Sequence, residues 1–159
     1  MAMATAHKVL SSHEGLVRHS VPGETLLYKM SGQDLNGALD YFMLDVQPKS
    51  GPPLHIHLRQ QETIHFIEGR YKVQLGQDVF TCERGGFVCV PAGTPHAFMN
   101  IGETLGQCII TFTPGGTERF FEEFSPVIRR EGPPDHAAIA AIFRRHDWEV
   151  VGPPLVAGD

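Results

Sequence analysis

The sequence is poor in charged residues and has no long apolar run. Charged side chains make up 19% of the 159 residues and apolar ones 42%, against about 25% charged in typical soluble domains, which excludes a disordered chain. Acidic residues exceed basic ones, 18 to 13, and the net charge is −5. A general nucleic-acid binder needs a basic face, and a transmembrane helix needs about 18 consecutive apolar residues. We therefore expect no nucleic-acid partner and no membrane contact.

Cysteine is also scarce, and its pattern indicates no covalent framework. The three cysteines are Cys82, Cys89 and Cys108. Their odd number and their spacing match neither a disulfide framework nor a zinc motif, so we interpret them as small buried apolar residues. Residues 1–14 lack the apolar segment of a secretory signal. A cytoplasmic location is the resulting prediction.

Glycine and proline, by contrast, are abundant. The 17 glycines and 12 prolines form about 18% of the chain, where about 12% is usual, so many tight turns and short strands are expected. Short β-prone runs at regular spacing are typical of an all-β sandwich or barrel, and the length predicts one domain over residues 1–159. The predicted strands are 24–31, 38–47, 54–58, 62–68, 70–75, 78–82, 86–91, 95–100 and 106–113.

Two local features refine this prediction. The segment 63–76 predicts a hairpin that turns at Gly69, because glycine adopts positive φ without strain. Residues 1–23 mix polar and apolar side chains and predict a loosely packed arm. The barrel core is therefore expected at about 25–113.

The C-terminal part changes character and predicts a short helical appendage over 117–159. Thr117 is placed to cap a helix over 118–124 that Pro126 ends. Asp135 is placed to cap a second helix over 136–146, whose apolar residues fall on one face. A last strand is predicted over 148–151.

Histidine is frequent, and three of the nine histidines form a pattern with one glutamate. His55 and His57 point to the same face of a strand, about 6.6 Å apart. Such a pair alone also occurs on ordinary exposed strands. Glu62 follows at a distance that brings a carboxylate back to that face, and His96 follows a Pro-rich turn. Together they predict a site for one divalent ion, and N/O ligands suit Fe, Mn, Ni, Cu, Co or Zn.

Strand parity names candidates for a surrounding pocket. Phe66 shares the face of Glu62, and Phe98 shares the face of His96. The strands 38–47 and 106–113 contain no candidate ligand that fixes which face points inward. In the first, either Phe42 and Leu44 or Met43 and Asp45 face inward. In the second, either Ile110 and Phe112 or Ile109 and Thr111 face inward. The alternative role for each of these side chains is to fill the core. The candidate pocket residues are Phe42, Phe66, Phe98, Ile110 and Phe112.

These motifs resemble those of the cupin superfamily. The second cupin motif, G-x5-P-x-G-x2-H-x3-N, is matched in full, and the first, G-x5-H-x-H-x3,4-E-x6-G, is matched except that its leading glycine stands at Gly51, three residues before His55 instead of five. The resemblance implies a cupin-type antiparallel jelly-roll β-barrel and a homodimer. The matching residues are His55, His57, Glu62 and Gly69 for the first motif, and Gly85, Pro91, Gly93, His96 and Asn100 for the second.

More narrowly, the chain is similar to single-domain bacterial cupins related to quercetin dioxygenases. That likeness implies a mononuclear metal-dependent dioxygenase acting on a small apolar enolic or phenolic, flavonol-like compound. Glu62 would then take the proton of the substrate oxygen, or would stay on the ion while a water acts as base. The same site also fits a non-catalytic cupin that binds a small molecule, and a metal-dependent isomerase or epimerase.

Overall fold

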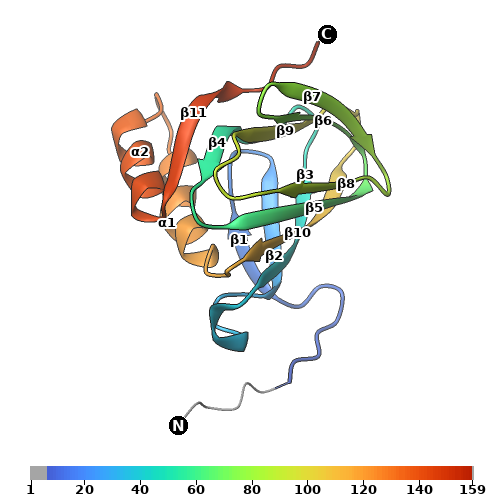
Figure 1. Cartoon of the computed structure of the whole chain (residues 1–159), viewed down its shortest axis with the longest axis vertical. Helices are drawn as coiled ribbons and strands as arrows, with labels where there is room; N and C mark the ends of the chain where they lie inside the picture. The colour runs from blue at the N-terminus through green and yellow to red at the C-terminus, as the bar shows by residue number, and fades with distance from the viewer. Residues whose placement is uncertain (1–6, 159) are drawn as a thin grey trace.

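Two antiparallel sheets face each other in the computed structural model, which describes residues 7–158 (Figure 1). The first sheet has the order β1-β2-β3-β10-β5-β8, and the second β11-β4-β9-β6-β7. This is the expected all-β jelly-roll, although the sheets do not close into a barrel. The strands of the first sheet are β1 (Leu16–His19), β2 (Glu24–Met30), β3 (Asp40–Val46), β10 (Gly106–Thr113), β5 (Gln61–Glu68) and β8 (Phe87–Val90). Those of the second are β11 (Trp148–Pro154), β4 (Pro53–His57), β9 (His96–Asn100), β6 (Arg70–Leu75) and β7 (Asp78–Glu83).

Side-chain alternation along the central strands places the core between the sheets. In β3, Phe42 and Leu44 are buried, whereas Met43 and Asp45 are half-buried. The same alternation in β10 turns Ile110 inward, and this residue pairs with Phe42 across the ladder. The structure therefore settles the two parities that the sequence left open.

The predicted hairpin over 63–76 is wrong, although both of its strands exist. β5 pairs with β10 and β8, whereas β6 pairs with β7 and β9 in the other sheet. Gly69 joins them at a corner with φ of 106°, and a Cβ there would lie 3.0 Å from the Cα of Gly106. The glycine does permit a sharp change of direction, but the chain crosses between sheets there.

The N-terminal arm is more ordered than expected. β1 lies within the predicted loose arm and pairs with β2, from Leu16 opposite Tyr28 to His19 opposite Thr25. Residues 1–6 of that arm lie outside the described residues. A short 3-10 helix, η1 (Leu35–Gly37), connects β2 to β3. Across residues 7–158, no helix combines the length and the apolar character needed to cross a membrane.

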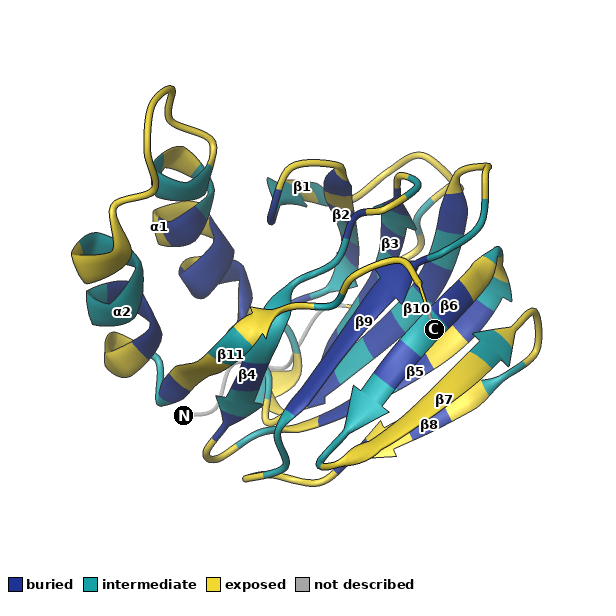
Figure 2. Cartoon of the chain, turned by 90° about the horizontal axis from the view of Figure 1, so that it is seen from above, coloured by how far each residue is buried: buried dark blue, intermediate teal, exposed yellow. Residues whose placement is uncertain are grey.

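Two helices, α1 (Glu118–Ile128) and α2 (His136–Arg145), stand at one end of the sheets, beside β11 and β4 (Figure 2). Contrary to the prediction, α1 does not end before Pro126 but continues through it to Ile128. The proline removes one backbone hydrogen bond in the last turn, while the buried aromatic side chains of the helix hold it against the core. Asp135 caps α2 as predicted, accepting a hydrogen bond from the Ala138 amide at 2.9 Å.

A buried carboxylate fixes the start of α1. Asp40 is 0% exposed, and it accepts hydrogen bonds from the amides of Gly116 and Thr117 and from the Thr117 hydroxyl. Tyr28 in turn donates its hydroxyl to the Thr117 Oγ1 at 2.7 Å. Contrary to the prediction, Thr117 therefore does not cap its own helix, because its side chain is used to join the helix to β3.

We expect Asp40→Asn to lower the free energy of unfolding by about 2–4 kcal/mol, because an amide group cannot accept all of the buried hydrogen bonds. Urea denaturation measures this loss. Asp45→Asn on the same strand is the matched control, with an expected cost below about 1 kcal/mol, since Asp45 is half-buried and accepts a single side-chain bond from Gln107. Equal losses in the two variants would contradict this role of Asp40.

Candidate metal centre

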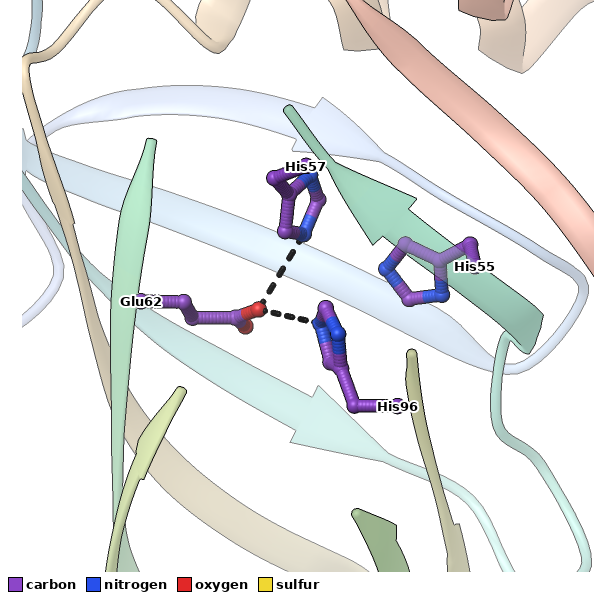
Figure 3. A group of neighbouring side chains, drawn as sticks. All are labelled: His55, His57, Glu62 and His96. Atoms are coloured by element: carbon purple, nitrogen blue, oxygen red, sulfur yellow. Dashed lines mark hydrogen bonds and ion pairs between the residues drawn. The ribbon is translucent and has the colours of Figure 1, made fainter. Parts of the chain in front are cut away.

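Three strands bring the predicted ligands to one point. β4 carries His55 and His57, β5 carries Glu62, and β9 carries His96, which pairs directly with His55 across the ladder. One potential ligand atom from each residue lies within 4.8 Å of the others, and all four residues are buried. The side chains of His57 and His96 point at the Glu62 carboxylate from two sides (Figure 3).

The hydrogen bonds orient the imidazoles. His57 donates from Nε2 to the Glu62 Oε2 at 3.2 Å, and His96 donates from Nε2 to the same oxygen at 2.8 Å. The Nδ1 atoms of His55 and His96 donate to the backbone oxygens of Pro53 and Thr94, at 2.7 and 2.9 Å. Because a carbonyl holds each Nδ1, the Nε2 atoms of these two rings are the ones presented to the centre.

Burial and mutual contact set the charge of the group. Burial lowers the pKa of His55 well below its ordinary value, and the nearby His96 and His57 lower it further. Burial also lowers the pKa of His57, against the opposing effect of Glu62. For His96 burial is again the largest effect and acts in the same direction, but the hydrogen bond to Glu62, the charge of Glu62 and the hydrogen bond to the Thr94 carbonyl together outweigh it, so the pKa is raised. Burial opposes ionisation of Glu62, yet hydrogen bonds from His57 and His96 lower its pKa overall.

The donor set fits a divalent transition metal. Three imidazoles and one carboxylate supply N and O ligands, and His55 and His57 favour the neutral form that ligation requires. In addition, the Nδ1 atom of His57 is buried and has no hydrogen-bond partner within residues 7–158. A buried polar atom without a partner is costly, which indicates that this ring is placed for something other than the stability of the fold.

A cavity of about 50 Å³ opens beside these residues. Four of the five predicted pocket residues line it, namely Phe42, Phe98, Ile110 and Phe112. Phe66 does not: it is fully buried and packs against Tyr71, with ring centroids 4.6 Å apart. It faces inward as predicted, but it stands four residues beyond Glu62, about 13 Å along the strand.

The C-terminal segment supplies an aromatic cover over this cavity, which the sequence patterns did not predict. Trp148 of β11 contacts both His57 and Phe120, with ring centroids 4.0 Å apart in each case. Its indole nitrogen donates to the Gln60 side chain at 2.7 Å. The spacing of the phenylalanines on α1 was the available signal, since an apolar helix face must be buried against something. The aromatic residues of this cover are Phe120, Phe121, Phe124, Phe143 and Trp148.

Glu24, the first residue of β2, also lines the cavity and was missed. It is 3% exposed, and its Oε1 atom has no hydrogen-bond partner in the part of the chain that the structure describes. Burial raises its pKa to about 8, against a hydrogen bond from Ser20 that lowers it, and the charge of Glu62 raises it further. No periodicity or motif marked this glutamate, because its burial depends on how β1 and β2 pack on the rest of the sheet.

Asn100, which ends the second motif, has a structural role. Its side-chain amide donates to the carbonyl oxygens of Val46 and Thr104, and its Oδ1 accepts from the Gly102 amide, all at 2.9 Å. These bonds tie the end of β9 to the neighbouring loop. His65 on β5 is exposed and faces away from the ligand group.

The raised pKa of Glu24 predicts a pH-dependent stability. Between its ordinary pKa of 4.5 and about 8, the folded state keeps a proton that the unfolded state has lost, so rising pH favours unfolding. Three other buried groups do not change charge over this range. Glu62 stays ionised, and Tyr71 and Cys108 stay neutral because their pKa values are raised, that of Cys108 to about 12.

Relative to Glu24→Gln, the wild-type protein should therefore lose about 1–3 kcal/mol of stability between pH 5 and pH 8. Urea titrations of both proteins across this range measure the difference. A constant difference would contradict the buried, protonated state of Glu24.

Comparison with known proteins agrees with this architecture. Residues 42–114 match the family model of the cupin domain. No curated protein matches the chain. The matched range contains all four potential ligands and every strand from β4 to β10.

Solved structures with the same fold are numerous. KdgF from Halomonas sp. is similar with a TM-score of 0.64 and 17% identity, over 72% of this chain and 99% of that one. An RmlC-like cupin from Shewanella frigidimarina has a TM-score of 0.61 and 17% identity, over 74% of this chain and 99% of that one. A sugar phosphate isomerase from Silicibacter pomeroyi has a TM-score of 0.57 and 18% identity, over 67% of this chain and 75% of that one. The cupin-domain match covers the central part of this chain, and the solved structures share its fold.

Proposed function

We propose that His55, His57, Glu62 and His96 bind one divalent transition metal ion, chosen among Fe, Mn, Ni, Cu, Co and Zn. The observation that carries this proposal is the convergence of four buried ligand atoms within 4.8 Å. When bound, such an ion supplies Lewis acidity and, if redox-active, electrons for O2. With the Glu62 carboxylate it carries a net charge of +1, which favours an anionic oxygen on the ligand.

The reaction that the cavity favours is dioxygenation of a small apolar enolic or phenolic compound. Apart from Ser20, Glu24, His55, His57 and Glu62, its lining is apolar and largely aromatic, which suits an unsaturated ring or chain more than a sugar. Glu62 is held charged by its two imidazole partners, so it can receive the proton of a substrate hydroxyl once that hydroxyl is acidified. The aromatic cover keeps bulk water away from that transfer.

The size of the cavity constrains the substrate further. About 50 Å³ holds a few water molecules, so a flavonol fits only if α1, α2 and Trp148 move aside. A ligand with a single ring needs a smaller adjustment. We therefore favour compounds smaller than flavonols within the proposed class, and we keep the homodimer and the cytoplasmic location as predictions.

One observation favours a second function, a metal-dependent isomerase or epimerase. Glu24 places a second acid in the cavity that holds the ligand group, and isomerisation needs a group that gives a proton as well as one that takes it. The two functions differ in their need for O2. A protein that keeps a metabolite through purification without converting it would instead be a non-catalytic binding cupin.

Metal binding is tested by elemental analysis of protein loaded with Co²⁺ or Ni²⁺. We expect about one ion per chain, together with quenching of the fluorescence of Trp148, the single tryptophan, because its ring contacts His57. His57→Ala and His96→Ala should each reduce bound metal at least about tenfold, since each removes one of four ligands.

His65→Ala is the matched control for these variants, because His65 lies on β5 but faces outward, and it should keep the ion and the quenching. Circular dichroism verifies that each variant is folded. Unchanged metal content in folded His57→Ala and His96→Ala proteins would refute the metal centre.

Oxygen uptake tests the reaction. Protein loaded in turn with Fe, Mn, Ni, Cu or Co is supplied with single-ring phenols, diketones and flavonols in an oxygen electrode. At least one combination should consume O2, and Glu62→Gln should slow it about 100-fold or more, because an amide cannot take the proton. No uptake with any metal would reject the dioxygenase, and turnover under strict anaerobiosis would establish the isomerase.

A further inference from the structure

Two carboxyl groups line the cavity, and they come from different strands of the first sheet. Glu62 lies in β5 among the imidazoles, whereas Glu24 begins β2, opposite Val46 of β3. The lining around Glu24 includes Ser20, Val21 and Pro52. Glu24 therefore belongs to a different strand from the ligand group but lines the same cavity.

A hydrogen bond from Ser20 reaches the Glu24 carboxyl group but leaves one of its two oxygens without a partner within residues 7–158. Its Oε1 atom is buried and has no hydrogen-bond partner among the described residues. Burying a polar atom without a partner destabilises a protein, and an apolar side chain of the same length would avoid that cost. Because Glu24 lines the cavity, such an atom is placed near any molecule that enters it.

The two acids differ in charge. The hydrogen bonds from His57 and His96 hold Glu62 ionised, whereas burial raises the pKa of Glu24 to about 8, so that it is mostly protonated near pH 7. A protonated carboxyl group donates a hydrogen bond as well as accepting one. Two acids whose environments separate their charges in this way are suited to different tasks within one site.

We propose that Glu24 is a second polar anchor for the ligand of this cavity, donating a hydrogen bond to one ligand oxygen while another oxygen binds at the histidine–glutamate centre. This inference rests on the proposed metal centre and narrows its ligand class. The ligand is a small phenol or enol with two oxygens held apart on a single ring, so that both cannot bind one ion. The apolar ring between them lies against the aromatic cover.

The test uses full-length protein loaded with Co²⁺, with resorcinol and hydroquinone as probes and phenol as the matched probe that lacks the second oxygen. Dissociation constants come from Trp148 fluorescence and from the visible absorption of the cobalt ion. Glu24→Met removes the hydrogen-bonding group at similar length, and Glu24→Gln keeps a neutral group that can donate. The cobalt content of each protein is measured in parallel.

Wild-type protein should bind at least one of the two dihydroxy probes about tenfold more tightly than phenol. Glu24→Met should abolish that preference while keeping its cobalt. Glu24→Gln should keep the preference and the cobalt content within about threefold of the wild-type values. The melting temperature of metal-free Glu24→Met should rise by about 2–4 °C, because the unpartnered carboxyl group is gone.

The outcomes separate this inference from the metal centre itself. If wild-type protein holds neither cobalt nor any of the other five candidate ions, the proposed metal centre fails, and the role of Glu24 fails with it. If cobalt binds but no dihydroxy probe is preferred over phenol, or Glu24→Met keeps the preference, the inference about Glu24 alone is refuted. A lower melting temperature for Glu24→Met would show that the carboxyl group stabilises the fold, and would contradict the proposed role.

Discussion

The interaction on which the site depends is that of one buried carboxylate with the imidazoles around it. An isolated charge in the interior is unfavourable, and Glu62 remains ionised because His57 and His96 donate to the same oxygen. This arrangement requires that β4, β5 and β9 hold a fixed register from opposite sheets. The jelly-roll provides it, since β4 and β9 pair directly while β5 lies in the facing sheet.

Much of the fold and of the ligand group could be predicted from the sequence, because both follow from short-range rules. Alternation of apolar residues located strands such as β3 and β10 to within a residue or two. The period of two also placed His55 and His57 on one face. What these rules do not encode is which sheet a strand joins, so the corner at Gly69 was mistaken for a hairpin.

Features set by long-range packing escaped prediction for the same reason. Parity gives the face of Phe66 but not its distance from the centre, so a core residue was placed in the pocket. Pro126 is a local signal to end a helix, and the burial of Phe120 and Phe124 in α1 overrides it. Glu24 and Trp148 acquire their surroundings only when the first and last strands have joined the sheets.

The pairing of β11 with β4 also bears on the order in which the molecule assembles. Trp148 lies opposite His57, and Val150 opposite His55, so the strand that bears two of the imidazoles keeps one unpaired edge until the last segment of the chain docks. Contacts between such distant parts of a sequence form late and slowly. The pocket is therefore completed only after β11 has joined β4.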